Sequence, residues 1–280
     1  MSHPLPATDI RHRAAVLGSP IEHSRSPILH NAGYEDLGMA DWDYTRIECT
    51  AEDLPRIVGE ADDTYRGFSV TMPAKFAALE FADEVTERAR QIGSANTLVR
   101  TDAGWRADNT DCDGISGALG ELLGERLDGT RRALVIGGGG TARPALWALA
   151  NAGVDDITVI NRSDRSAELA PLLEPFGVEF RFRGFDTDLR AAAADAEVIV
   201  STVPSAAVEG HEQALAHAPI LDVIYEPWPT PLTVAAAANG HLTVGGHVML
   251  AHQAYGQFEQ FTGRPAPRAA MRRALEASLQ

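Results

Sequence analysis

Residues 133–142 read ALVIGGGGTA, an apolar run that leads into four consecutive glycines. The glycines match the pattern GxGxxA, in which the first glycine permits a tight turn, the next lets the backbone approach a pyrophosphate, and a small third residue lets the helix lie close to the strand. The N–H groups at the start of that helix would face the phosphates. A glycine-rich turn can also bind nothing, but a complete strand, turn, helix and strand surround this one. We therefore expect a dinucleotide site formed by Gly137, Gly138, Gly139, Gly140, Thr141 and Ala142.

Outward from this turn, the second half of the chain alternates apolar runs with helical stretches. The runs are nearly continuous in apolar residues, which is typical of parallel strands covered on both faces. This pattern predicts a doubly wound parallel sheet of the Rossmann type. The runs cover residues 131–137, 156–162, 197–204, 219–225 and 241–246.

The N-terminal part also alternates strands and helices, and it ends in a hairpin around the turn residues 102–104. One helix begins near Ser26, where serine suits the N-cap and Pro27 suits the first helical position. Predicted strands cover residues 13–18, 42–49, 65–72, 97–100 and 104–108, and further helices are predicted at 51–61, 74–83 and 83–93.

Two helices at the end of the chain, at 247–261 and 268–279, exceed what the nucleotide sheet needs. We expect them to pack on the N-terminal domain, which would then be discontinuous. The prediction is an α/β protein with two domains. An αβα substrate domain covers residues 1–112 and 247–280, and a Rossmann-type doubly wound cofactor domain covers 113–246.

Length and composition exclude several classes of protein. A chain of 280 residues suggests two domains and should bury roughly three quarters of its extended surface. Cys49 and Cys112 show no CxxC spacing and the nine histidines show no metal-ligand spacing, so we expect neither a disulfide framework nor a metal. Because the chain shows neither a signal peptide nor an apolar run of membrane-helix length, we expect a cytoplasmic protein.

The formal net charge of −15 argues against nucleic acid and anionic membranes as partners, since both favour a basic face. We expect a small-molecule substrate, and a monomer or a homodimer. Attraction of an anionic ligand would have to come from local donors such as serines, arginines and helix N-termini.

The identity of the cofactor depends on the end of the strand at 156–162, where NAD-binding folds usually place an acid that holds the ribose. This chain has Asn161, Arg162 and Ser163 there. Arg162, with Arg165 and Arg143 nearby, suits a 2′-phosphate, which an acid would repel. These arginines could instead be solvated, and Asp164 could serve as a displaced ribose ligand. We predict NADP, bound by Asn161, Arg162, Ser163 and Arg165.

The only lysine of the chain, Lys75, ends the run GFSVTMPAK, and Asp111 lies in ADNTDCDG. A lysine and a carboxylate that meet in a cleft can carry out proton-coupled carbonyl chemistry. Lys75 could be an ordinary solvated lysine, but arginine stands at every other position where charge alone would suffice. We predict that the ammonium donates a proton or stabilises an alkoxide, and that Asp111 orients it and keeps it charged.

The chain contains, in order, the motifs HSRSP, GFSVTMPAK, GSANT, ADNTDCDG, GGGGTAR, NRS, DVIYEPWPTPL and MLAHQA. Their order and approximate spacing resemble those of the shikimate dehydrogenases, over essentially the whole chain. Because the motifs are scattered through both predicted domains, this match is more specific than a dinucleotide fingerprint alone. The resemblance implies an NADP-dependent oxidoreductase that interconverts 3-dehydroshikimate and shikimate in chorismate and aromatic amino acid biosynthesis.

By position in these motifs, the resemblance implies that Lys75 and Asp111 are the catalytic pair, and it implies roles for further residues. Ser24 and Ser26 would hold the substrate carboxylate as neutral donors, although Ser26 could serve only as a helix cap. Asn96 and Thr71 would hold ring hydroxyls with Gln253, although such strand-end residues are often turn formers. Cofactor contacts are implied for Thr202, Gly246, Tyr225 and Met249, the last two at the nicotinamide end.

Two other functions stay open. An NAD-preferring quinate/shikimate dehydrogenase is disfavoured, since it should carry an acid in place of Arg162 and a bulkier threonine in place of Ser26. A non-catalytic NADPH-binding sensor is also disfavoured, because a sensor needs neither Lys75 nor Asp111.

Overall fold

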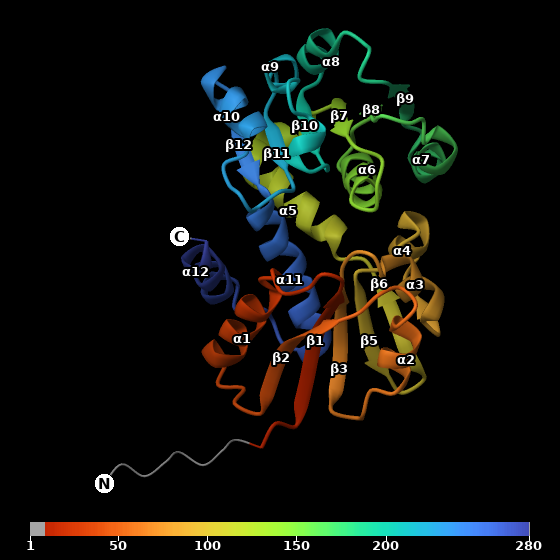
Figure 1. The fold of residues 1–280 in the computed structure, drawn as a ribbon, viewed down its shortest axis with the longest axis vertical. Coiled ribbons are helices and arrows are strands. Elements are labelled where there is room, and N and C mark those ends of the chain that lie inside the picture. The colour runs from red at the N-terminus through yellow and green to blue at the C-terminus, as the bar shows by residue number, and fades with distance from the viewer. Residues whose placement is uncertain (1–8, 280) are drawn as a thin grey trace. The chain divides into compact units, whose positions relative to one another are not determined.

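The computed structural model describes residues 9–279, which fold into two compact units (Figure 1). The first unit contains the described residues up to Thr110 and from Ala254 onward, and the second contains Asp111–Gln253. The sequence places the limits of the domains at 112/113 and 246/247, and these limits stay a prediction. None of the helices within residues 9–279 has the length and apolar character needed to cross a membrane.

The first unit is built on one mixed sheet. Its strands are β1 (His12–Gly18), β2 (Trp42–Glu48), β3 (Tyr65–Val70), β4 (Glu84–Val85), β5 (Thr97–Thr101) and β6 (Gly104–Asp108), in the order β2-β1-β3-β5-β6-β4. β1 pairs in parallel with β2 and β3, whereas β5 runs antiparallel to β3 and β6. The carboxyl ends of β1 and β3 therefore lie at the same edge of the sheet as the start of β5 and the end of β6.

The predicted strands and the hairpin of this unit are confirmed, but β4 was not predicted. It lies within the predicted helix 83–93, which in the structure begins only at Glu87. The cause is the N-cap at Thr86, whose hydroxyl accepts the Ala89 N–H at 3.3 Å and so fixes the start of the helix one turn later than expected.

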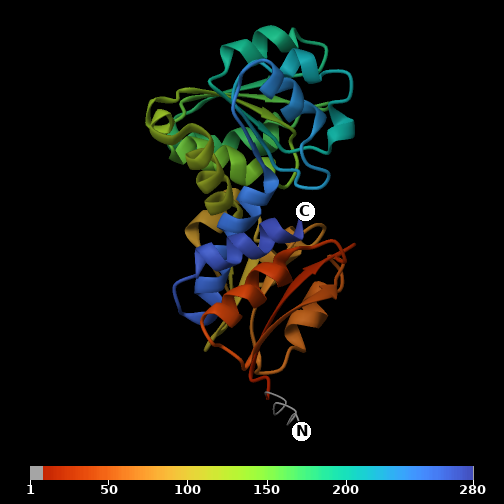
Figure 2. The same ribbon diagram turned by 90° about the vertical axis from the view of Figure 1, so that its left-hand side faces the viewer.

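The helices of the first unit are α1 (Ser26–Asp36), α2 (Leu54–Gly59), α3 (Lys75–Phe81), α4 (Glu87–Ile92) and α12 (Arg268–Ser278), together with the last part of α11 (Gly246–Thr262). α12 packs against α1, as both views show, so the expected return of the C-terminal helices to this unit is confirmed (Figures 1 and 2). The predicted N-cap of α1 is wrong. Arg25 occupies that position without a side-chain cap, and Ser26 is already helical.

A cluster of aromatic rings fills the space between the sheet and the helices of this unit. The ring of His30 stacks on Tyr44 with 4.1 Å between ring centroids, and Phe258 and Phe261 lie beside it. His30 is completely buried. Burial lowers the pKa of His30 to about 3, and the nearby Gln257 amide offsets this only partly, since neither ring nitrogen has a hydrogen-bond partner in the described part of the chain.

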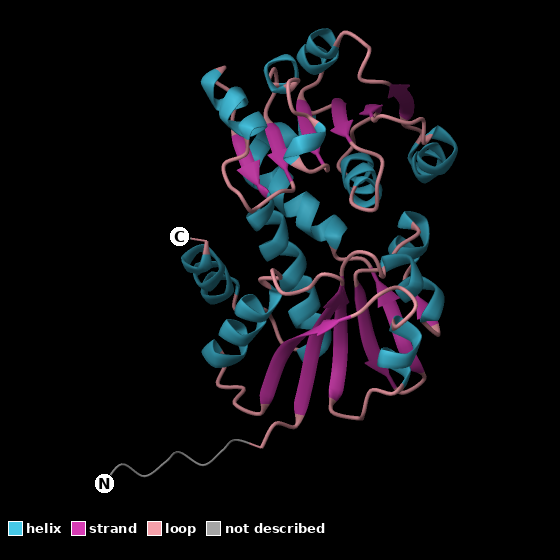
Figure 3. Ribbon diagram, in the orientation of Figure 1, coloured by secondary structure: helices cyan, strands magenta, loops and turns pink. Residues whose placement is uncertain are grey.

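The second unit contains a parallel sheet with helices on both faces (Figure 3). Its strands are β7 (Arg132–Ile136), β8 (Asp156–Ile160), β9 (Glu179–Arg183), β10 (Val198–Ser201), β11 (Ile220–Asp222) and β12 (Thr243–Gly245), in the order β12-β11-β10-β7-β8-β9. This is a doubly wound order. From β7 the chain adds β8 and β9 on one side, then returns to add β10, β11 and β12 on the other, so the strand order reverses between β7 and β10. The predicted Rossmann-type fold is confirmed. β9 was not predicted, because its sequence EFRFR alternates apolar and charged residues at a half-exposed edge.

The helices of the second unit are α5 (Asp111–Leu123), α6 (Ala142–Asn151), α7 (Ser166–Leu173), α8 (Leu189–Asp195), α9 (Glu212–Leu215), α10 (Pro231–Ala238) and the first part of α11, with short 3₁₀ turns at Gly124–Gly129, Glu174–Phe176 and Ser205–Ala207. α5 and α11 approach closely through two glycines. A Cβ atom at Gly114 would lie 2.7 Å from the carbonyl oxygen of Met249, and one at Gly117 would lie 2.2 Å from the His252 ring. No larger side chain fits at either position, so these glycines fix the first turns of α5 against α11.

Candidate active site

The glycine turn lies at the point where the order of the second sheet reverses. Gly137 follows β7 directly and has a φ of +110°, a conformation that L side chains rarely adopt. A Cβ atom there would lie 2.4 Å from the Thr202 hydroxyl, which follows β10 and donates to the Ile136 carbonyl oxygen at 2.8 Å. Only glycine therefore fits at Gly137, and Thr202 faces the turn from the neighbouring strand.

The outer part of the turn is open. Cβ atoms at Gly139 and Gly140 would meet no atom within 4 Å, whereas Ala142 at the start of α6 is completely buried. The backbone of the turn thus faces free space, and α6 begins directly behind it, where the Ala142 N–H donates to the Gly139 carbonyl oxygen at 3.1 Å. A pyrophosphate fits this arrangement, because its charge would meet both the backbone donors and the positive end of the helix dipole.

The polar residues after β8 form a tight local turn. The Asn161 side chain donates to the Ser163 carbonyl oxygen at 2.9 Å. The Asp164 carboxylate accepts the Ser166 N–H at 2.8 Å and the Ser166 hydroxyl, and these hydrogen bonds lower the pKa of Asp164. This carboxylate is therefore occupied at the start of α7, which argues against its binding a ribose hydroxyl.

The three arginines expected near a 2′-phosphate differ in their partners. Arg165 forms a two-pronged ion pair with Glu168, one turn along α7. Arg143 donates to the Glu168 carbonyl oxygen at 3.3 Å, and burial lowers its pKa. Arg162 is exposed, and no hydrogen bond or ion pair joins it to another of residues 9–279. Of the three, Arg162 is thus the one whose guanidinium can bind a phosphate without first releasing a partner within residues 9–279.

The residues predicted at the nicotinamide end lie together in the second unit. The Gly246 N–H donates to the Ile224 carbonyl oxygen at 3.0 Å, and a Cβ atom at Gly246 would lie 1.9 Å from the carbonyl oxygen of Val223. The start of α11 is therefore held against the segment that continues into Tyr225. Met249 lies in the first turn of the same helix and is buried.

In the first unit, the predicted substrate residues gather at one edge of the sheet. Ser24 and Ser26 follow the carboxyl end of β1, and Thr71 follows that of β3. Asn96 precedes β5, which begins at this same edge because it runs antiparallel to β3. Lys75 opens α3 directly after the β3 end, and its carbonyl oxygen accepts the Ala95 N–H at 3.0 Å.

The two serines are linked to each other and to the sheet. The Ser26 N–H donates to the Ser24 hydroxyl oxygen at 3.4 Å, and the Arg46 side chain donates to the Ser24 carbonyl oxygen at 2.6 Å and 2.9 Å. Ser24 and Ser26 thus present hydroxyl groups from a braced loop, which suits recognition of a carboxylate by neutral donors.

The Asn96 side chain is deeply buried and holds the end of β6. Its carbonyl oxygen accepts the Thr110 N–H at 2.7 Å and the Thr97 hydroxyl at 2.8 Å, and its amide donates to the Thr110 hydroxyl at 3.0 Å. Thr110 directly precedes Asp111 in the chain. Asn96 therefore has a positioning role, and its predicted contact with substrate stays a prediction.

Asp111 and Gln253 are brought near each other in the second unit. Asp111 opens α5, and one turn later a Cβ atom at Gly114 would lie 3.1 Å from the Cβ of Gln253 on α11. The Gln253 amide donates to the Leu250 carbonyl oxygen at 2.9 Å. Lys75 belongs to the first unit and Asp111 to the second, so their pairing stays a prediction.

Buried polar residues that were not predicted from the sequence support this edge of the sheet. Gln257 lies one turn after Gln253 on α11, so its spacing from a predicted ligand could have drawn attention to it. Thr110 stands next to Asp111 in the same motif. Nothing in the local sequence marks the other members. They are Tyr44, Ser69 and Thr97.

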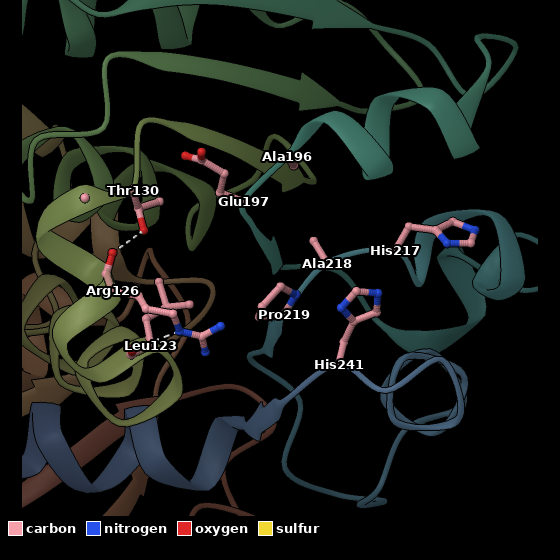
Figure 4. A pocket seen from close by; sticks show the side chains of 10 residues that line it. Leu123, Arg126, Thr130, Ala196, Glu197, His217, Ala218, Pro219 and His241 are labelled. Carbon is pink, nitrogen blue, oxygen red and sulfur yellow. Dashed lines mark hydrogen bonds between the residues drawn. The ribbon is translucent and has the colours of Figure 1, made fainter.

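The second unit also has an open cavity of about 480 Å³ at the amino ends of β10, β11 and β12 (Figure 4). Arg126, His217 and His241 line it, and Glu197 at its rim accepts the backbone N–H groups of Arg131 and Arg132. No predicted site residue lines this cavity. It lies at the opposite ends of the strands from the glycine turn, where open α/β sheets do not usually bind their ligands.

Comparisons with known proteins agree with this arrangement. Residues 16–98 match the family model for the shikimate dehydrogenase substrate binding domain, 121–219 match that for shikimate/quinate 5-dehydrogenase, and 246–276 match that for the shikimate 5′-dehydrogenase C-terminal domain. The shikimate dehydrogenase (NADP(+)) of Methylobacterium radiotolerans is 39% identical over 269 residues, which cover 91% of this chain and 93% of that protein. The chain is also 35% identical to the pentafunctional AROM polypeptide of Saccharomyces cerevisiae, but spans only 17% of its length.

Solved structures show the same fold. The crystal structure of Mycobacterium tuberculosis shikimate dehydrogenase is 54% identical, with a TM-score of 0.89 and coverage of 95% of this chain and 99% of that one. The structure of quinate dehydrogenase from Corynebacterium glutamicum in complex with NAD is 28% identical, with a TM-score of 0.85 and coverage of 95% and 99%. The fold is thus similar to that of enzymes with two different named substrates, and the site residues must distinguish between them.

Proposed function

We infer that this chain, which belongs to the shikimate dehydrogenase family, is an oxidoreductase that interconverts 3-dehydroshikimate and shikimate with NADP. The observation that carries the inference is the gathering of Ser24, Ser26, Thr71, Lys75 and Asn96 at one edge of the first sheet. A hydroxylated ring with a carboxylate needs hydroxyl and amide groups around a single basic side chain, and this edge supplies them. The reaction belongs to the formation of chorismate and aromatic amino acids.

We propose that the glycine turn, Arg162 and the start of α6 hold the cofactor. The backbone of Gly139 and Gly140 faces open space, and Arg162 offers a guanidinium for the 2′-phosphate. Bound NADPH would supply a hydride to the ring ketone of 3-dehydroshikimate. The Asp164 carboxylate accepts hydrogen bonds from Ser166 at the start of α7, so it is not poised to accept a ribose hydroxyl as NAD would require.

The proposed catalytic pair is Lys75 and Asp111. The Lys75 ammonium would donate a proton to the oxygen that gains charge, or stabilise that charge as an alkoxide. Asp111 would keep the ammonium charged and fix its direction. Ser24 and Ser26 would orient the ring by its carboxylate, and Gln253 would hold a ring hydroxyl.

The NAD-preferring quinate/shikimate dehydrogenase is the second candidate, and the similarity to the quinate enzyme is the observation in its favour. Arg162 and Ser26 argue against it, because an NAD-preferring quinate enzyme should carry an acid in place of Arg162 and a bulkier threonine in place of Ser26. We also propose a cytoplasmic location, supported by the two buried free cysteines, and a monomer or a homodimer.

The assay that tests the proposal measures reduced nicotinamide formed from shikimate or from quinate, each with NADP and with NAD. We expect the highest kcat/KM with shikimate and NADP. Formation of reduced nicotinamide with quinate and NAD alone would favour the second candidate. Cofactor binding without turnover of either acid would favour the sensor.

A further inference from the structure

We propose that Gln257 is a positioning residue that fixes the start of the helix that carries Asp111. The inference rests on the function proposed above. Gln257 lies on α11 in the first unit and is 1% exposed, and Ser69, Thr97, Asn96 and Thr110 around it are all buried.

Two series of hydrogen bonds, which we call arms, start at Gln257, and one of them runs toward Asp111. The Gln257 amide nitrogen donates to the Asn96 carbonyl oxygen and to the Thr97 hydroxyl, both at 3.1 Å. The Thr97 hydroxyl in turn donates to the Asn96 side chain, which binds the Thr110 N–H at 2.7 Å. Every bond of this arm lies in the first unit, and its last member is covalently joined to Asp111. The arm therefore sets the position from which α5 begins.

The other arm runs from Gln257 to Ser69 and Tyr44. The Gln257 side-chain oxygen accepts the Ser69 hydroxyl at 2.7 Å, and the Ser69 oxygen accepts the Tyr44 hydroxyl at 2.6 Å. Ser69 on β3 and Tyr44 on β2 are both buried, so this arm holds the amide oxygen of Gln257 against the sheet. The amide nitrogen of Gln257 is thereby directed at Asn96 and Thr97.

The chemistry of the side chain explains why glutamine stands at this position. It must offer one acceptor to Ser69 and donors to Asn96 and Thr97, and only an amide of this length combines them. A leucine of similar shape would leave the Ser69 and Thr97 hydroxyls without their partner. The hydrogen bonds of Gln257 go to Ser69, Asn96 and Thr97, so Gln257 would act on the reaction through these residues.

Gln257→Leu is the direct test, with Gln260→Leu as its matched control. Gln260 lies on the same helix and donates to Asp108 at 2.7 Å, outside both arms. We expect Gln257→Leu to lower kcat/KM for shikimate by about 10- to 100-fold, the cost of small misplacement of reacting groups. KM for NADP should stay unchanged. Gln260→Leu should lose thermal stability and keep the kinetic constants of the original chain.

Two further variants separate the arms and keep the test decisive if Gln257→Leu does not fold. Thr97→Val interrupts the arm to Thr110, and Ser69→Ala removes the partner that directs the Gln257 amide. Both should lower kcat for shikimate and leave KM for NADP unchanged. A purely structural role would lower the thermal stability of both variants and leave kcat unchanged. Unchanged kcat and KM in these two, or in a folded Gln257→Leu, would overturn the inference while leaving the proposed function intact. An original chain that does not oxidise shikimate would overturn the proposed function itself.

Discussion

The Asn96 side chain holds Thr110, with its oxygen 2.7 Å from the Thr110 nitrogen and its amide nitrogen 3.0 Å from the Thr110 hydroxyl oxygen. The residue before Asn96, Ala95, donates its N–H to the carbonyl oxygen of Lys75. Residues 95 and 96 thus tie down both Lys75 and the residue that precedes Asp111. A short turn before β5 is therefore the common support of the two predicted catalytic side chains.

Replacing Lys75 should abolish most turnover without abolishing binding. We expect Lys75→Ala to lower kcat by about 10²- to 10⁴-fold, the usual contribution of a positioned acid or base. Equilibrium binding of shikimate, measured by calorimetry, should persist, since the serines and amides remain. Near-normal turnover in this variant would remove Lys75 from the mechanism.

Lys75→Arg is the companion variant, because it keeps the charge but cannot release a proton in this pH range. If Lys75 transfers the proton, the arginine variant should be as slow as the alanine variant. If Lys75 only stabilises charge, the arginine variant should recover much of kcat. The comparison separates the two chemical roles.

Arg162 should decide the choice between the two nicotinamide cofactors. We expect Arg162→Ala to raise KM for NADP by about tenfold or more, since one charge-assisted contact to a phosphate is worth roughly 1.5–3 kcal/mol, and to leave KM for NAD nearly unchanged. Arg165→Ala is the comparison variant. Arg165 is also a predicted cofactor residue, but its guanidinium already binds Glu168, so its loss should raise KM for NADP less. Equal effects of the two substitutions on NADP would contradict the assignment.

A side chain in the glycine turn should affect both the stability of the fold and the binding of the cofactor. Gly137→Ala should weaken both, because its φ of +110° and the Thr202 hydroxyl 2.4 Å away leave no place for a methyl group. Gly120 on α5 is exposed, and a Cβ atom there would meet nothing within 4 Å. Gly120→Ala should therefore raise the free energy of unfolding by about 0.5–1 kcal/mol, as in other helix interiors. Denaturant titration of both variants tests the contrast.

The buried His30 should make the fold sensitive to acid. Because burial lowers its pKa to about 3, the unfolded chain binds a proton near pH 6.5 that the folded chain does not. Stability should thus be fully present above pH 6.5 and fall as the pH drops toward 3, by about 2 kcal/mol at pH 5 from this group alone. In His30→Phe this contribution to the pH dependence of the free energy of unfolding should vanish. The same slope in His30→Phe and in the control His23→Phe, whose ring is exposed, would contradict the assignment.

The parts of the fold that follow a local rule could be predicted from the sequence. The apolar runs and the glycine turn identify β7, α6 and the parallel sheet, because each strand is buried on both faces. β9 has no such signature, since EFRFR lies at a half-exposed edge. The start of α4 depends on one capping hydroxyl at Thr86, and the sequence alone does not show which of several polar residues will cap.

In the candidate site, too, some residues can be predicted from the sequence and others only from the structure. Individual site residues such as Lys75 and Arg162 could be proposed from motifs and charge. The ion pair of Arg165 with Glu168 follows an i, i+3 spacing that the sequence contains, but its competition with a phosphate is visible only in the structure. Gln257 and Asn96 are 161 residues apart in the chain, and only the folded sheet brings them into contact.

The proposed function is tested most directly by a steady-state comparison of shikimate and quinate, each with NADP and with NAD, in which the formation of reduced nicotinamide is measured. We predict turnover that is fastest with shikimate and NADP and that is nearly lost in Lys75→Ala. A chain that binds NADP but oxidises neither acid, or one that prefers quinate and NAD, would contradict it.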